Sequence, residues 1–289
     1  MFPLKDDNPT TRTPVVTIAL IVINVLVYFL VQPFDIIAGT DFTFETAAIP
    51  DELTTGEPLT EREFCTVLTG GSDAPSSIVT TEDVCSSPTD NARFPGKNVY
   101  LAVLYSMFLH GGLLHLGGNM LFLWVFGNNI EDHLGKVKYV VFYLIAGAVA
   151  TAAHVLPDPG SDIPLIGASG AVAGVMGAYL VWFPWARIKT IAILLILDLK
   201  AWMVLAFWFG SQFFISPSDG VAWLAHVGGF VFGAIIAVLA RANEGFRNQL
   251  WQHKYVTQNP GATAGPWDQR YGGREELQDN QTPSWHPGP

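Results

Sequence analysis

Residues 166–183 read IGASGAVAGVMGAYLVWF, and residues 221–240 read VAWLAHVGGFVFGAIIAVLA. Neither run contains Asp, Glu, Lys or Arg, and both approach the roughly 20 residues that a helix needs to cross a bilayer core. Each run carries one polar side chain near its start, Ser169 or His226, followed by small residues at helical spacing. The two runs therefore predict a pair of membrane helices that can pack closely.

Four further apolar runs have a similar character, at residues 15–31, 112–130, 139–156 and 201–215. Half of the chain is hydrophobic and only 14% is charged, against about 25% charged residues in soluble domains. We therefore expect an all-α membrane protein, a bundle of six transmembrane helices. The apolar stretch 187–200 is bracketed by charges, and we expect it to lie at the membrane interface.

Polar segments divide the chain around these runs. The stretch 33–98 is too long for a simple turn and predicts a folded or partly ordered insert, whereas the polar end of the chain cannot build a packed core. The expected parts are a cytoplasmic N-terminal segment (1–14), a first transmembrane helix (15–32), an extracytoplasmic acidic insert (33–98), a core of five transmembrane helices (99–240) and a disordered cytoplasmic tail (241–289).

The charged residues set the expected orientation. In a six-span topology, lysine and arginine fall almost entirely on one side, and the acidic residues of the insert fall on the other. The positive-inside rule then places both termini in the cytoplasm, and we expect a multi-pass protein of a bacterial plasma membrane. Cys65 and Cys85 would lie outside, where a disulfide is favoured over two free thiols. No basic surface suggests nucleic-acid binding.

Polar side chains inside membrane spans cost free energy, and they indicate function by default. His115 and Asn119 fall in the second predicted span, Ser169 in the fourth and His226 in the sixth. Ser169 lies about one turn into its helix and His226 about one and a half turns, so both are expected near the outer face. His115 is a few residues into its own span, at a similar depth.

Small residues lie on the same helix face as Ser169 and on the same helix face as His226. They follow Ser169 at i+4 and i+8, and glycines follow His226 at i+3 and i+7. Such stripes let membrane helices approach until their backbones touch. That approach would bring the hydroxyl of Ser169 within hydrogen-bond reach of the imidazole.

This arrangement predicts acyl-transfer chemistry. A serine hydroxyl becomes a nucleophile when a base takes its proton, and His226 can be that base. His115, Asn119 and the backbone N–H of Ser169 can donate to the oxyanion that forms. Ser169 also stands in a first helical turn, where free N–H groups favour negative charge.

Gly167 and Gly170 flank the nucleophile and leave room for a substrate backbone. The predicted spans offer no acidic third member, so we interpret the site as a dyad without metal or cofactor. The H-E-x-x-H motif of zinc proteases is absent. An aspartyl protease would need two membrane aspartates, and Asp198 is unpaired near the inner interface.

In three motifs the sequence resembles the rhomboid family of intramembrane serine proteases. Its G-x-S-G motif matches residues 167–170, its H-x-x-x-N motif matches 115–119, and its A-H-x-x-G-x-x-x-G motif matches 225–233. The resemblance covers residues 99–240 and the first span. It implies that Ser169 is the nucleophile, that His226 is the general base, and that His115 and Asn119 line the oxyanion site.

The resemblance further implies single-span membrane proteins as substrates, cut near the outer face of the lipid bilayer. It gives His110 a structural or solvent-linked role and places Glu131 at the inner end of the second helix. Many relatives have an aromatic residue four positions after the nucleophile, stacked on the base, and this chain has Ala173 there. Leu101 and Ala102 replace a Trp-Arg pair.

Other functions stay open at this stage. Taken singly, each polar residue has a structural explanation: a serine in a membrane helix usually bonds its own backbone, a histidine is more often buried and hydrogen-bonded than a base, and an asparagine more often joins two helices. A catalytically inactive rhomboid-like protein that binds membrane clients would keep the helices but lose Ser or His, and both are present here. A transporter or channel would show an inverted repeat or a path of polar residues, and neither is visible.

Overall fold

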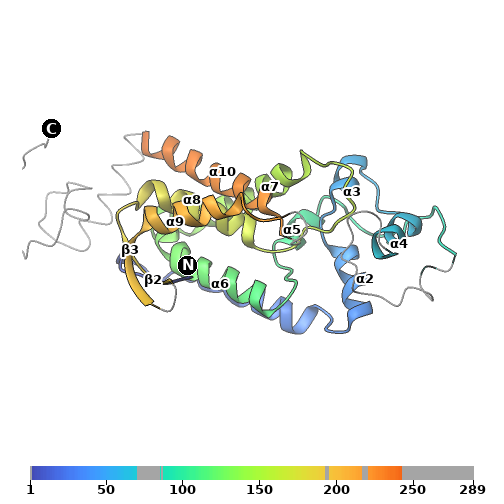
Figure 1. Cartoon of the computed structure of the whole chain (residues 1–289), viewed down its shortest axis with the longest axis horizontal. Coiled ribbons are helices and arrows are strands. Elements are labelled where there is room, and N and C mark those ends of the chain that lie inside the picture. The colour runs from blue at the N-terminus through green and yellow to red at the C-terminus, as the bar shows by residue number, and fades with distance from the viewer. Residues whose placement is uncertain (1, 70–84, 86, 193–194, 217–220, 243–289) are drawn as a thin grey trace, which may run out of the picture.

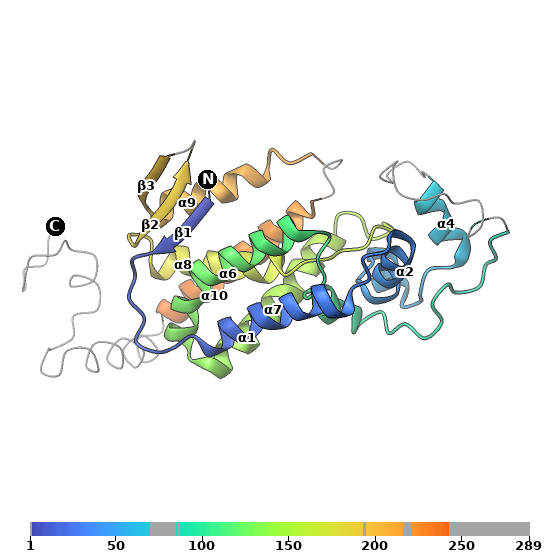
Figure 2. The ribbon, with the colours of Figure 1, turned by 90° about the horizontal axis from the view of Figure 1, so that it is seen from below.

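The structure is a computed structural model that describes residues 2–69, 85, 87–192, 195–216 and 221–242. Helices run side by side along the long axis, with a small sheet at one end and the described part of the insert, residues 33–69, 85 and 87–98, at the other (Figures 1 and 2). The helices of the bundle are α1 (Val15–Leu26) with its π-helical continuation η1 (Val27–Val31), α6 (Leu113–Leu134), α7 (Lys136–Val155), α8 (Ser169–Trp182), α9 (Ala201–Gln212) and α10 (Trp223–Ala242).

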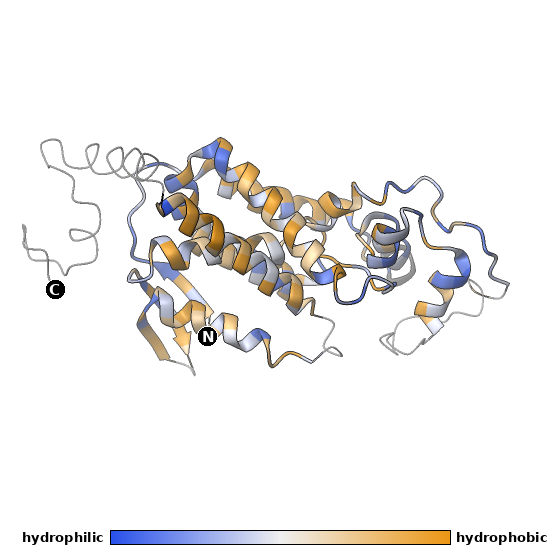
Figure 3. Ribbon diagram, turned by 90° about the horizontal axis from the view of Figure 1, so that it is seen from above, coloured by the Kyte–Doolittle hydropathy of each residue, from blue (hydrophilic) through white to orange (hydrophobic). Residues whose placement is uncertain are grey.

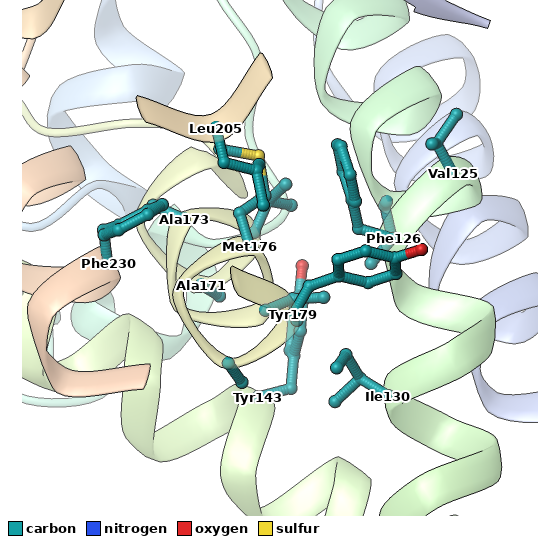
Figure 4. Close-up of a cluster of buried hydrophobic side chains, with 14 of the residues drawn as sticks. Val125, Phe126, Ile130, Tyr143, Ala171, Ala173, Met176, Tyr179, Leu205 and Phe230 are labelled. Atoms are coloured by element: carbon teal, nitrogen blue, oxygen red, sulfur yellow. The ribbon is translucent and has the colours of Figure 1, made fainter. Parts of the chain in front are cut away.

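Helix α8 lies at the centre of this bundle and contacts α6, α7, α9 and α10. Its side chains from Gly170 to Tyr179 are all buried. In Figure 4, Met176 and Tyr179 of α8 face Phe126 of α6 and Leu205 of α9 within one apolar cluster. The outward faces of the surrounding helices are also largely apolar (Figure 3), as expected of a surface in contact with lipid.

Helices lie at all six of the predicted ranges, but the structure does not confirm a count of six spans. Among the described helices, α7 and α10 are long and apolar enough to cross a membrane, while α8 and the stretch Val15–Val31 are apolar but shorter. Helix α9 has only 12 residues. The last turns of helix α6 contain Glu131, Asp132 and His133, which make its C-terminal end polar.

Helices α8 and α10 meet through glycine, as the small-residue stripes predict. A methyl group on Gly229 would lie 2.1 Å from the carbonyl oxygen of Gly170, and one on Gly233 would lie 1.9 Å from that of Gly174. Gly177 is pressed in the same way against the backbone of α10. Only hydrogen fits at these positions, so the two backbones are in direct contact.

The glycine contact predicts that Gly233→Ala destabilises the protein by about 1–3 kcal/mol, as overpacking does in a filled core. Gly210→Ala in α9 is a matched control, because a methyl group there meets nothing within 4 Å. Thermal unfolding in detergent micelles should give a lower Tm for the first variant and an unchanged or higher Tm for the second. Equal Tm values for the two variants would contradict the contact.

The insert folds around a small core of its own. It contains α2 (Ile36–Thr46), α3 (Pro50–Thr55) and α4 (Glu61–Thr69), and α5 (Ala102–Ser106) follows it. The predicted disulfide between Cys65 and Cys85 is present. Lys97 forms an ion pair with Glu52 in which both side chains are 1% exposed, and the Lys97 ammonium also donates to the Phe44 carbonyl at 2.6 Å.

Backbone hydrogen bonds attach this insert to the loop between α7 and α8. The N–H of Leu165 donates to the carbonyl of Ala48 at 2.8 Å, within an isolated antiparallel bridge. The N–H of Asp51 donates to the carbonyl of Ser161 at 3.1 Å. The insert is therefore fixed to the loop that leads into α8.

Asp162 of this loop lies among acidic side chains of the insert. Burial raises its pKa from 3.8 to about 6, and the negative charges of Asp51 and Glu63 add to the shift. Because the folded protein holds this proton more tightly than the unfolded chain, stability falls as the pH rises from 3.8 to about 6. The carboxylate thus opposes docking of the insert at neutral pH.

We expect Asp162→Asn to raise Tm at neutral pH, where the wild-type side chain is ionised, and to leave Tm unchanged near pH 4. Glu57→Gln, at an exposed position in the insert, is the control. Tm measured from about pH 4 to pH 8 tests this, since the difference between wild type and Asp162→Asn should grow through the pKa of that carboxyl group. A difference independent of pH would contradict it.

At the far end of the bundle lies a three-stranded antiparallel sheet of order β1-β2-β3, formed by β1 (Phe2–Asp6), β2 (Arg187–Ala192) and β3 (Leu195–Lys200). The sequence analysis assigned no strands to the apolar stretch 187–200, and its expected place at the membrane interface stays a prediction. Buried Ile188 and Thr190 alternate with more exposed Arg187 and Lys189, which is the period of a strand.

The sheet is joined to the bundle by the N-terminal segment, whose residues 1–14 the sequence predicted only to be polar. Asp6 is buried and accepts hydrogen bonds from Tyr179 at 2.9 Å and from Asn129 at 2.5 Å. Glu131, near the C-terminal end of α6, accepts from the N–H groups of Val16 and Thr17. The predicted disordered tail falls, beyond Ala242, outside the described residues.

Candidate active site

Ser169 is the first residue of α8, at the end of the bundle that carries the insert. Gly167 has a φ of +123°, a conformation that residues with a side chain rarely adopt. Its N–H donates to the carbonyl of Ser106 at 2.9 Å. Ala168 and Gly170 are buried while Ser169 is half-buried. Of these three residues, Ser169 is therefore the most accessible.

His226 stands in the first turns of α10 and is held by α9. Its Nδ1 lies 2.7 Å from Oε1 of Gln212. The Trp208 ring lies beside the imidazole, with ring centroids 5.8 Å apart and planes inclined by 41°. The ring therefore has contacts from α9 on two sides.

The two helices bring the neighbours of Ser169 and His226 into contact. A methyl group on Gly170 would lie 3.8 Å from the carbonyl oxygen of Ala225, and Ser169 and Ala225 line one small cavity. Within the described ranges, no hydrogen bond joins the Ser169 hydroxyl to the His226 ring. Ser169 and His226 therefore lie on helices that touch, but their side chains are not hydrogen-bonded to each other in the described structure.

His115 of α6 lies near Ser169. The N–H of Gly111 donates to its Nδ1 at 3.3 Å, which assigns the ring proton to Nε2. A methyl group at Gly167 would lie 2.7 Å from Nε2 of His115 and 3.5 Å from Oγ of Ser169. The glycine therefore leaves open a space that both side chains border.

Asn119 is also on α6, one turn after His115, and its side chain is buried. Its Nδ2 has no hydrogen-bond partner among the described residues. A buried donor without a partner costs about 1–3 kcal/mol, so this amide is available to an oxygen atom that a ligand brings. The His110 ring packs against His115 at 5.1 Å between centroids.

Two residues of α9 were missed by the sequence reasoning. Trp208 was not predicted to lie at the site, yet its ring packs beside His226, with the ring planes tilted by 41°, while position 173 is an alanine. Gln212 was not singled out, although it is the only amide side chain in the apolar run 201–215. In the described parts of the chain, no three His, Cys, Asp or Glu side chains group as metal ligands would.

The fold and the site together define a helical-bundle membrane protein with a serine–histidine pair at one end. Residues 97–243 match the family model of the Rhomboid domain, and the chain belongs to the rhomboid family. The family resemblance carried by the three motifs is confirmed.

Several curated proteins share part of this sequence. RHOMBOID-like protein 5 of Arabidopsis thaliana is 36% identical over 74 residues, which cover 26% of this chain and 24% of that protein. Rhomboid protein 1, mitochondrial, of Saccharomyces cerevisiae is 30% identical over 138 residues, covering 46% and 33%. Rhomboid protease GluP of Bacillus subtilis is 37% identical over 78 residues, covering 27% and 15%. The matched stretches thus span a third or less of each relative.

Proposed function

We propose that this protein is an intramembrane serine endopeptidase that cleaves single-span membrane proteins near the outer face of the bilayer, using Ser169 and His226 as a dyad. One observation carries the proposal. Helices α8 and α10 touch backbone to backbone, and their contact begins at Gly170 and Ala225, the residues next to the dyad. The name of the similar Bacillus subtilis protein, a rhomboid protease, supports the same activity.

Cleavage would follow the steps of serine hydrolysis. His226 takes the proton of Ser169 as Oγ attacks the peptide carbonyl, and then gives that proton to the leaving amine. Water releases the acyl group in a second step, with the same imidazole as base. Hydroxyl and ring must come within hydrogen-bond distance when substrate binds, and such contacts are often longer in a free enzyme.

We expect three donors to stabilise the oxyanion. The backbone N–H of Ser169 is free at the start of α8, at the positive end of the helix dipole. Nε2–H of His115 borders the space beside Gly167, and the unpartnered Nδ2 of Asn119 lies one turn further along α6. Glycine at positions 167 and 170 leaves this space open to a substrate backbone.

The proposal includes the membrane topology: six spans, both termini in the cytoplasm, and the insert outside. The insert is attached to the loop before Ser169, so the dyad lies at the outer end of the bundle in this orientation. The opposite end carries Arg187, Lys189 and Lys200 in its sheet, which agrees with the positive-inside rule. A bacterial plasma membrane remains our proposal for the location.

A second candidate is a catalytically inactive rhomboid-like protein that binds membrane clients. The observation in its favour is that Ser169 and His226 are not hydrogen-bonded to each other in the described structure. Such a protein would bind single-span proteins and leave them intact.

Cleavage of a single-span reporter in proteoliposomes separates the two candidates. We expect the wild type to cut the reporter, and both Ser169→Ala and His226→Ala to abolish cleavage while Tm stays near the wild-type value. Ser87→Ala, at an exposed position in the insert, should cut at the wild-type rate. Reporter bound but uncut by folded wild type would favour the client-binding protein, and cleavage by either dyad variant would refute the assignment.

Loss of one oxyanion donor is expected to slow the chemical step without weakening substrate binding. Asn119→Ala should therefore lower kcat by about 10²-fold and change KM little. Asn128→Ala is a control on the same helix, more than two turns away from Asn119. An unchanged kcat in Asn119→Ala would remove this residue from the oxyanion site.

A further inference from the structure

We propose that Gln212 is a positioning residue that holds the catalytic base His226 in one tautomer and one orientation. This inference rests on the proposed function. It is carried by the 2.7 Å contact between Oε1 of Gln212 and Nδ1 of His226.

The amide of Gln212 has its orientation fixed by its own helix. Nε2 donates to the carbonyl of Trp208 at 3.0 Å and to the hydroxyl of Ser211 at 3.3 Å. If the amide were turned over, two carbonyl oxygens would face each other at the Trp208 position. The oxygen of the amide, which can only accept, is therefore the atom that faces His226.

This orientation fixes the tautomer of His226. An acceptor at Nδ1 requires the ring proton to be on Nδ1, which leaves the lone pair on Nε2 free to take a proton. In serine hydrolases a carboxylate commonly plays this orienting part, and an amide free to turn over can select the wrong tautomer. Here the carbonyl of Trp208 prevents that rotation.

Burial strengthens the effect. Gln212 is 4% exposed, and a buried amide costs free energy unless its hydrogen bonds are made. All of its described partners lie on α9 except His226, so the imidazole supplies the one bond that reaches across to α10. Trp208 packs beside the ring and limits its rotation. Helix α9 therefore sets both the tautomer and the orientation of the base.

Kinetics of two substitutions test this role. Gln212→Leu should lower kcat by about 10²-fold, the size of a general-base contribution, with KM nearly unchanged. Gln212→Glu keeps an oxygen acceptor beside Nδ1 but turns a second oxygen toward the Trp208 carbonyl, so it should recover part of this loss. It should also move the acid limb of the pH profile of kcat/KM to higher pH, because a carboxylate beside the ring favours its protonated form.

Phe207→Ala is the matched control, since Phe207 is on α9 but half of its surface is exposed. It should leave kcat unchanged. Wild-type kcat in Gln212→Leu would overturn the inference. So would equal losses in Gln212→Leu and Gln212→Glu with no shift in the pH profile, because that result indicates a purely structural residue.

A readout that needs no activity separates this inference from the proposed function. Nitrogen-15 NMR of the His226 ring in Ser169→Ala protein should show the Nδ1–H tautomer, and Gln212→Leu in that background should shift it toward Nε2–H. The same tautomer in both proteins would refute the role of Gln212 even if the wild type cleaves. If the tautomer shifts as expected but the wild type cleaves no substrate, the proposed protease function fails while the role of Gln212 in orienting His226 stands.

Discussion

Backbone contact between α8 and α10 depends on glycine on both sides. At Gly229 and Gly233 a single methyl group would overlap a carbonyl oxygen of α8. Because the helices touch there, the first turn of α8 lies against the first turns of α10. Helices α6, α7 and α9 contact α8 as well. The positions of Ser169 and His226 follow from the contact between α8 and α10, and no long-range polar interaction is needed to bring their helices together.

The rest of the site is added by elements that surround this pair. Helix α6 contributes His115 and an Asn119 amide without a partner, and α9 contributes Gln212 and Trp208 on the far side of the imidazole. The loop before Ser169 is held by Ser106, whose carbonyl accepts from Gly167 and whose hydroxyl accepts from Ala48 of the insert at 2.6 Å. The insert and the turn that carries Ser169 therefore both bond to Ser106.

Much of this could be predicted from sequence, because the signals are local. Apolar runs predicted helices at their observed places, glycine spacing predicted the α8–α10 contact, and two cysteines in one polar segment predicted their disulfide. The strands at 187–200 were missed although β2 and β3 pair with each other locally, because the nearly unbroken apolar run between Arg187 and Lys200 hides the alternation of a strand. Only the third strand, β1, comes from a distant part of the chain. Gln212 was missed for a related reason, since one amide in an apolar helix does not reveal which ring it meets. Docking of the insert on Leu165 likewise depends on backbone atoms, which every residue has.

Whether the glycine contact produces an activated hydroxyl can be measured with a fluorophosphonate, which reacts covalently with activated serines. We expect peptide mass spectrometry to find the label on Ser169 in the wild type, and to find none in folded His226→Ala protein. An absence of label on folded wild type, or equal labelling of His226→Ala, would contradict the coupling of Ser169 to His226 across the two helices.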